Sequence, residues 1–390
     1  MLATRDAGIS TGGAGLDPEA RARAVAPLVA AMAGEVERSR SLPPALLDAL
    51  HGAGLFRALL PEAFGGGEAA PTPYLRMLEV IAREDASTAW CIGQASGCSM
   101  AAAYVAPEVA WEIWGSDTQA ALAWGAGAPG TARAVAGGYV VDGGWGFASG
   151  GRHASWLGGH CQVVGDAAPR ERTMLFPKAA AAMVDDWQVM GLRGTGSDAY
   201  SVAGLFVAER YSVARDVDAE RRQPGPLYRF STTHLYASGF AAVALGIARG
   251  TLDALVELAG SKTPSATTRA LRDSPVVQSQ IAQAEAKLRA ARALLLTTLD
   301  EAWDQAQSGA LTLDQRMSIR LASTYAIHQA KEVTAAAYQE AGATAIFASH
   351  PFERRFRDVH SVAQQVQGRT SHFETVGQHL LGLPANQRFV

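Results

Sequence analysis

The sequence predicts an α+β protein in which the strands are grouped in the middle of the chain. Three observations support this: helical spacing of apolar residues up to about residue 117, glycine and alternating β-type residues from 118 to 224, and two long amphipathic repeats after 275. Because helices, strands and helices follow one another in blocks, we expect the sheet to form a domain of its own. The expected parts are a flexible tail (1–15), an N-terminal α-helical domain (16–117), a central β domain (118–225) and a C-terminal helical bundle (226–390).

Composition narrows the functional class. The 390 residues suffice for several domains with a sizeable core. The formal net charge of −3 shows no basic footprint for nucleic acid. We find no apolar run that approaches a membrane span, and Met1–Gly15 lacks the apolar stretch of a signal peptide. We therefore expect a cytoplasmic protein with neither a nucleic-acid nor a membrane partner.

The three cysteines, Cys91, Cys98 and Cys161, form no Cys-x-x-Cys pair, and no histidine cluster has metal-ligand spacing. Free cysteines pack as small hydrophobes, so we expect core thiols and no metal site.

The first third predicts a series of helices. Asp17-Pro18 is a helix start, with Pro at the first helical position. Gly54 is a typical residue to follow the end of a short helix. The expected helices after the first are Ala45–Ala53, Pro73–Arg83, Ser87–Tyr104 and Pro107–Trp114.

The middle third predicts short strands whose spacing suits a small antiparallel barrel or sandwich. Gly191–Asp198 is a Gly-rich loop between two of them. It is neither a Walker A loop nor a dinucleotide fingerprint, because it lacks the Lys-Ser/Thr pair and opens no helix. The expected strands are Leu122–Trp124, Tyr139–Asp142, Trp145–Ala148, Cys161–Gly165, Thr173–Phe176, Trp187–Met190 and Ser201–Val207.

The stretch Gly143–Trp156 is the most distinctive. We expect its first two glycines to form a tight turn, with Tyr139, Val141, Trp145 and Phe147 on one face of a hairpin. Ser149 then lies between this aromatic face and two glycines, where backbone can approach a ligand closely. A flat apolar cofactor needs such a surface, although a hairpin packed on its own core would fit the pattern equally well.

The last third predicts long amphipathic helices of the kind that form bundles. One covers Val277–Trp303 and the next Leu313–Ala341, closed by Gly342. Arg354–Gly382 is expected to form one further helix or two.

Four stretches in order, Leu42–Gly67, Gly143–Trp156, Gly191–Val207 and Pro351–Asp358, resemble the acyl-CoA dehydrogenase superfamily over nearly the whole chain. The resemblance implies an N-terminal helical domain, a central antiparallel β-barrel or sandwich and a C-terminal helical bundle. It also implies a homotetramer.

Within this superfamily, the Trp145–Ser149 sequence is more similar to the reduced-flavin-dependent, two-component (group D) monooxygenases. Where dehydrogenases often carry a catalytic Glu, this chain has Gln367, and an amide cannot accept an α-proton. The arginine and aromatic signature for the FAD diphosphate is also poorly kept around 272–280. The resemblance thus implies reduced FMN or FAD from a separate NAD(P)H:flavin reductase. Oxygen would pass from O2, through a C4a-(hydro)peroxyflavin, to a small molecule with an aromatic or polyketide-type ring, an amine or a sulfur.

The resemblance also implies site residues. Phe147, Ala148 and Ser149 would lie against the flavin, with the Ser149 hydroxyl or N–H near N5, and Trp124 would form a wall. Arg272 and the turn from Gly342 to Thr344 would bind the flavin phosphate.

This chain departs from the monooxygenase pattern after Arg357-Asp358, where many members carry a His and Gln365 stands here. Ser149 and Gln365 are therefore the catalytic candidates, and a substrate that needs no His base, such as an amine, a sulfur or an acidic enol, is favoured. We expect structural roles for His153 and His360, and a structural ion pair between Arg357 and Asp358.

Two alternatives stay open at this point. One is an acyl-CoA dehydrogenase or oxidase with an atypical base, and the other is a non-catalytic flavin- or ligand-binding homologue.

Overall fold

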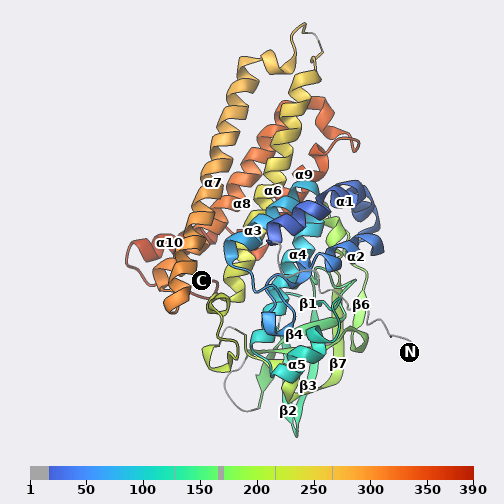
Figure 1. Ribbon diagram of the computed structural model, residues 1–390, viewed down its shortest axis with the longest axis vertical. Helices are drawn as coiled ribbons and strands as arrows, with labels where there is room; N and C mark the ends of the chain where they lie inside the picture. The colour runs from blue at the N-terminus through green and yellow to red at the C-terminus, as the bar shows by residue number, and fades with distance from the viewer. Residues whose placement is uncertain (1–16, 128, 166–170, 216, 266) are drawn as a thin grey trace, which may run out of the picture.

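The computed structural model describes residues 17–390 except 128, 166–170, 216 and 266, so the expected tail at 1–15 lies outside the described residues. Long helices form an elongated bundle that rises from a sheet, and the N-terminal helices lie beside the junction of the two (Figure 1). Helix α4 (Ala86–Ser99) contacts both the bundle helix α6 (Thr232–Ser261) and the first strand. The limits predicted for the domains stay predictions.

Most helices agree with the predicted ones, whereas the helix Thr232–Ser261 was not among them. The segment predicted over Leu313–Ala341 has those bounds, and the C-terminal segment forms two helices. Caps define several starts: the Asp85 carboxylate accepts the Thr88 N–H (2.7 Å), and Ser231 forms a capping box with His234. The α-helices are α1 Pro18–Ser39, α2 Pro44–Gly52, α3 Pro71–Glu84, α4 Ala86–Ser99, α5 Pro107–Ala110, α6 Thr232–Ser261, α7 Pro275–Ser308, α8 Leu313–Ala341, α9 Phe352–Gln364 and α10 Ser371–Leu380.

The sheet is mixed, which corrects the antiparallel prediction. It has the order β6-β7-β3-β2-β4-β5-β8, and β1 and β2 both run parallel to β4. Trp187–Met190 is not a strand, because the Trp187 N–H bonds the Asp198 side chain (3.2 Å) instead of a ladder. The strands are β1 Leu122–Trp124, β2 Gly130–Val135, β3 Gly138–Trp145, β4 Trp156–Val164, β5 Glu171–Pro177, β6 Ala182–Val184, β7 Ala199–Ala208 and β8 Ser212–Val213.

The predicted tight turn at Gly143 is wrong, because β3 continues through it to Trp145. Instead, glycines at these positions leave space for the Trp145 indole ring. A Cβ on Gly143 would lie 2.8 Å from that ring, and one on Gly159 2.6 Å. A register shift after Val141 and the positive φ of Phe147 (62°) then break the alternation. Phe147 is consequently exposed while Trp145 is buried, so they do not share a face.

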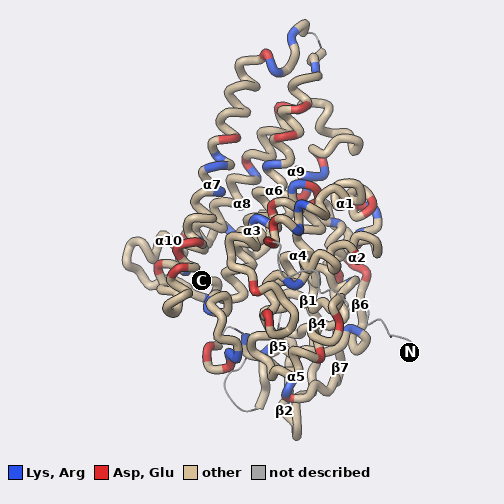
Figure 2. The backbone as a smooth tube through the Cα atoms, viewed as in Figure 1, with Lys and Arg blue, Asp and Glu red and all other residues tan. Residues whose placement is uncertain are grey.

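Helix α6 forms the centre of the bundle and packs on α3, α4 and α8. It is long and apolar enough to cross a membrane by length and composition alone, contrary to the sequence expectation. However, 78% of its most apolar window is buried inside the protein, as in the core helix of a globular fold. Figure 2 shows both acidic and basic residues along α7, as expected for a helix with one solvent-facing side.

The Gly-rich loop 191–198 is fastened to α9. The Leu192 N–H donates to the Asp358 carboxylate (2.6 Å), which holds Leu192 in the left-handed region (φ 54°). A Cβ on Gly191 would lie 2.3 Å from the Arg357 carbonyl, so only glycine permits this approach. Arg357 pairs with Glu37 of α1 (2.9 Å) and not with Asp358, which corrects the predicted ion pair.

Asp358 is buried, and burial raises the pKa of its carboxyl to about 7. The negative charges of Asp85 and Glu37 raise it further, while the Leu192 N–H and Arg354 oppose the shift. An unfolded aspartate has a pKa of about 3.9. The folded state therefore binds more protons between these two values, and this group makes the free energy of unfolding fall as pH rises through that window.

We expect Asp358→Asn to remove that dependence while keeping an oxygen for the Leu192 N–H. Urea unfolding of both proteins from pH 5 to 8 should give a stability difference that changes by up to about 1.4 kcal/mol per pH unit below pH 7 and is constant above it. Asp273→Asn, at an exposed position, is the control. Parallel curves for wild type and Asp358→Asn would contradict the assignment.

Candidate active site

One face of α4 organises the site. Trp90, Gln94 and Cys98 are four residues apart, so they lie along one side of the helix. Trp90 Nε1 donates to Ser149 Oγ (3.0 Å), and Gln94 Nε2 donates to the Trp124 carbonyl (3.4 Å). Two of the predicted site residues, Trp124 of β1 and Ser149 of the turn after β3, are thus brought to the same helix face.

Parallel aromatic rings extend this face onto α6. The Trp90 and Phe240 rings stack with centroids 3.7 Å apart and planes at 6°. Tyr236 stacks on the same Phe240 ring at 5.5 Å and 9°. The Tyr236 hydroxyl lies 3.3 Å from Cys98 Sγ, which joins the stack back to α4. The result is a wall of stacked, parallel aromatic rings that Trp90 joins to the Ser149 hydroxyl.

A chain of hydroxyls fixes the direction of the Ser149 hydrogen bonds. Thr195 Oγ1 donates to the Leu192 carbonyl (2.8 Å), because a carbonyl can only accept. Ser197 therefore donates to Thr195 (2.6 Å), and Ser149 in turn donates to Ser197 (2.7 Å). Ser149 also accepts the Trp90 N–H. Its proton is committed, and one lone pair remains to accept a further donor.

Trp124 is buried, and its ring contacts the side chains of Arg215 and His160. The Arg215 guanidinium is 4.5 Å from its ring centroid, a cation–π distance, and the His160 ring is 5.4 Å away. Burial, followed by the Arg215 charge, lowers the pKa of His160 well below its usual value. His160 is therefore a neutral imidazole whose Nδ1 lies 2.9 Å from Thr173 Oγ1.

Of the three consecutive residues predicted to contact the flavin, two are buried and one is exposed. Ala148 is buried, and its N–H donates to the Asp198 carbonyl (3.2 Å). Ser149 is only 7% exposed, whereas Phe147 is 67% exposed with its ring edge-on to Trp187 at 5.9 Å. The structure thus leaves Phe147 as a rim residue.

The predicted phosphate ligands lie elsewhere. Arg272 belongs to the α6–α7 connection, at the end of the bundle far from the sheet (Figure 1). Lys262 joins the predicted turn there, because its Nζ donates to the Ala341 carbonyl (2.6 Å) and to Thr344 Oγ1 (2.9 Å). Lys262 follows the last residue of α6, Ser261, and Phe240 is 21 positions before Ser261 (261 − 240). That interval corresponds to roughly 32 Å of helix. Within one chain, the predicted phosphate ligands are therefore far from the residues predicted to contact the flavin ring.

Gln365 lies at the C-terminal end of α9. Its Oε1 accepts the Gln367 N–H (2.7 Å), and its Nε2 is buried without a partner among the described residues. Gln367, at the position of the dehydrogenase Glu, accepts from Arg320 Nη1 (2.7 Å). Both amides are therefore engaged in the bundle.

The expected core thiols and structural histidines agree with their surroundings. All three cysteines are free and buried, and burial raises the pKa of Cys98 and Cys161 to about 12. Burial lowers the pKa of His153 to about 3, and His360 Nδ1 lies 2.7 Å from the Phe356 carbonyl.

Sequence reasoning missed Trp90, Ser197, Tyr236 and Phe240. The available signal was spacing: Trp90, Gln94 and Cys98 recur every four residues in a predicted helix, as do Tyr236 and Phe240 later. Nothing in the local sequence marks Ser197, because its contact to Ser149 spans 48 positions.

The fold and the residues of this site can be compared with known proteins. The family model described as "Acyl-CoA dehydrogenase, N-terminal domain" matches residues 12–109, and "Acyl-CoA dehydrogenase, C-terminal domain" matches 238–368. "Indole-3-acetate monooxygenase" of Pseudomonas putida is 30% identical over 90% of each chain. "Flavin-dependent monooxygenase, oxygenase subunit HsaA" of Rhodococcus jostii (strain RHA1) is 29% identical over 87% of this chain and 92% of its own.

Among solved structures, the 3-HSA hydroxylase from Rhodococcus sp. RHA1 superposes with a TM-score of 0.90 at 27% identity, covering 96% of this chain and 99% of its own. These relatives cover nearly the whole length of the chain and are named monooxygenases or hydroxylases. The chain therefore belongs to the acyl-CoA dehydrogenase superfamily and, within it, to the flavin-dependent monooxygenases.

Proposed function

We propose that the chain is the oxygenase component of a two-component system. It takes reduced FMN or FAD from a separate NAD(P)H:flavin reductase and, with O2, oxygenates a small molecule. When bound, the reduced flavin supplies the electrons that activate O2. The observation that supports this most strongly is the buried Ser149 hydroxyl, which has one free lone pair beside a wall of parallel rings.

The free lone pair suits reduced flavin in particular. The ring nitrogen N5 carries a proton in reduced flavin and is therefore a donor, whereas in oxidised flavin it is only an acceptor. Ser149 has no proton to offer, because it donates to Ser197. We infer that Ser149 accepts from N5–H of the reduced cofactor and binds the oxidised form less well.

Other residues would hold the ring and exclude water. Ala148 and the stacked rings of Trp90 and Phe240 provide apolar contact, and Trp124 closes the neighbouring side. A dry site favours transfer of oxygen to substrate over loss of hydrogen peroxide. Phe147, at the rim, would cover the entrance.

We assign the flavin phosphate to Arg272, Gly342 and Thr344, with Lys262 as an additional cation, on a neighbouring copy of the chain. Two observations support this arrangement. The separation along α6 is too great for one molecule of flavin to reach both sites within a chain. Apolar side chains close to that end are exposed, including Val276 (63%) and Ile346 (65%), as expected for a surface that another copy covers. A homotetramer would provide such contacts, in the cytoplasm where reduced flavin is generated.

The substrate we favour is one that needs no histidine base. His160 is a poor base because burial and Arg215 lower its pKa, and Gln365 cannot act as one. An amine, a sulfur, an acidic enol or an aromatic ring that is already electron-rich meets this condition.

The decisive measurement is an anaerobic titration with oxidised and photoreduced FMN and FAD. We expect saturable binding of the reduced form, at least about tenfold tighter than the oxidised form, which corresponds to about 1.4 kcal/mol, the size of one net hydrogen bond. NAD(P)H should be consumed only when a reductase is added. Tight oxidised FAD bleached by an acyl thioester would instead indicate a dehydrogenase, and no affinity for either form would indicate a non-catalytic homologue.

We expect Ser197→Ala to reduce this preference. Without Ser197, the Ser149 proton is free to turn toward an acceptor, so oxidised flavin should bind better. The ratio of dissociation constants, oxidised to reduced, should fall about fivefold to tenfold, as expected for one net hydrogen bond. Thr195→Ser retains the hydroxyl chain and should preserve the ratio. An unchanged ratio in Ser197→Ala would show that the direction of the chain does not select the redox state.

A further inference from the structure

A cavity of about 500 Å³ lies beside the N-terminal end of α6, away from the Ser149 site. It is partly open and is lined by the linker before α6, the α7–α8 connection and the last residues of the chain. His234 lines it from α6, whereas Tyr236, two positions later and thus on the opposite side of the helix, contacts Cys98 of α4. The cavity is therefore separate from the aromatic wall. Its arginines are Arg221, Arg229, Arg316 and Arg388.

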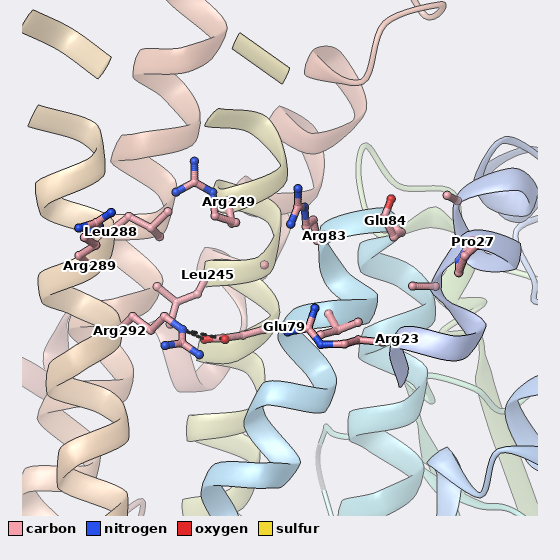
Figure 3. Close-up of a pocket in the computed structure, with 14 residues that line it drawn as sticks. Arg23, Pro27, Glu79, Arg83, Glu84, Leu245, Arg249, Leu288, Arg289 and Arg292 are labelled. Atoms are coloured by element: carbon pink, nitrogen blue, oxygen red, sulfur yellow. Dashed lines mark hydrogen bonds and ion pairs between the residues drawn. The ribbon is translucent and has the colours of Figure 1, made fainter. Parts of the chain in front are cut away.

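A second arginine-lined cavity, between α1, α3, α6 and α7, provides an internal comparison (Figure 3). Every arginine that lines it is paired with a carboxylate. Arg292 binds Glu79 at 2.9 Å, and Arg249 binds Asp253 at 2.6 Å. The remaining pairs are Arg23 with Glu19, Arg83 with Asp253 and Arg289 with Glu285. The charge of that cavity is balanced by the protein itself.

The cavity at α6 is not balanced in this way. Across the part of the chain that the structure describes, Arg229, Arg316 and Arg388 form no ion pair with a carboxylate side chain. Arg221 pairs with Asp218 at 3.1 Å, and that Asp218 side chain is 79% exposed. Main-chain oxygens satisfy only part of the guanidinium groups: Arg229 donates to Ala306 (2.8 Å), and Arg316 Nη1 lies 3.5 Å from Val390 O. Among the side chains of the lining, four arginines therefore face a single carboxylate, that of Asp218.

Two buried N–H groups in the lining also lack an acceptor. His234 Nδ1 accepts the Ser231 N–H (3.2 Å), so the neutral ring carries its proton on Nε2. Burial, with the charges of Arg320 and Arg316, lowers the pKa of His234 to about 3 and keeps it neutral. His234 Nε2 and Arg316 Nε are both buried without a partner among the described residues. A buried donor without an acceptor is unfavourable, and a bound oxyanion would offset that cost.

We propose that this cavity binds a small molecule through a multiply charged oxyanion group, of the phosphate type. Arg316 and Arg388 would supply charge and paired N–H donors, and His234 Nε2 would supply a neutral donor from the cavity wall. Guanidinium groups bind phosphate and carboxylate oxygens through two parallel hydrogen bonds, which suits this set of donors. The volume is within the range of small-molecule sites. This site is independent of the flavin chemistry proposed above.

The test is calorimetric titration of the full chain with inorganic pyrophosphate, and with citrate to distinguish phosphate from carboxylate. We expect saturable binding of pyrophosphate with one site per chain, weakened at least tenfold by Arg316→Gln and several-fold by Arg388→Gln. Arg388 is exposed, so its replacement leaves the core intact. Pyrophosphate should raise the melting temperature of the wild-type protein and have less effect on either variant.

Arg289→Gln, in the balanced cavity, is the matched control and should bind as the wild type does. Weaker binding of citrate than of pyrophosphate would confirm a preference for phosphate. The proposal is overturned if neither probe gives saturable binding, if citrate binds as tightly as pyrophosphate, or if Arg289→Gln weakens binding as much as Arg316→Gln.

Discussion

The hydrogen bond from the Trp90 indole to the Ser149 hydroxyl is the contact on which the site depends. Trp90 can only donate, and the carbonyl of Leu192 at the other end of the hydroxyl chain can only accept. With both ends fixed, the intervening protons of Ser149, Ser197 and Thr195 have a single arrangement that satisfies every bond. A buried chain of this kind is rigid, because reversing any one hydroxyl leaves a neighbour unsatisfied in a low-dielectric surrounding. The protein thereby presents an acceptor, and not a donor, to whatever lies against Ser149.

The same chain of hydroxyl groups links the site to the packing of the helical bundle. Leu192 is held in the left-handed region by Asp358 of α9, and its carbonyl terminates the hydroxyl chain. Arg357, the neighbour of Asp358, binds Glu37 of α1 at the same junction. A shift of α9 would therefore move the loop 191–198, and with it Ser197. The redox preference argued for Ser149 thus depends on packing between parts of the molecule that are distant in sequence.

How much the sequence could predict follows from how local each signal is. The limits of α8 were correct because an amphipathic repeat and the Thr312 cap are local features. The parallel pairing of β2 with β4 was missed because alternation does not encode the partner strand. The glycine at 143 predicted a turn, but its actual neighbour is the Trp145 ring, a contact that only the folded chain creates. Ser149 could be singled out from its glycine neighbours, whereas Ser197 could not, since its role arises from a tertiary hydrogen bond.

Charge is compensated beside the middle of α6 but not at its N-terminal end. Where α6 meets α3 and α7, the Arg292 guanidinium and the buried Glu79 carboxylate compensate each other. Burial raises the pKa of Glu79 and Arg292 opposes that shift, so the pair is maintained against the cost of removing both charges from water. At the N-terminal end of the same helix, Arg316 has a buried Nε and no ion pair with an Asp or Glu side chain among the described residues. Leaving a cation in that state is unfavourable in the empty protein, and the cost is recovered only when an anion enters. A helix with a balanced cavity at one side and an unbalanced one at its start is therefore better explained by a ligand at the second cavity than by a requirement of folding.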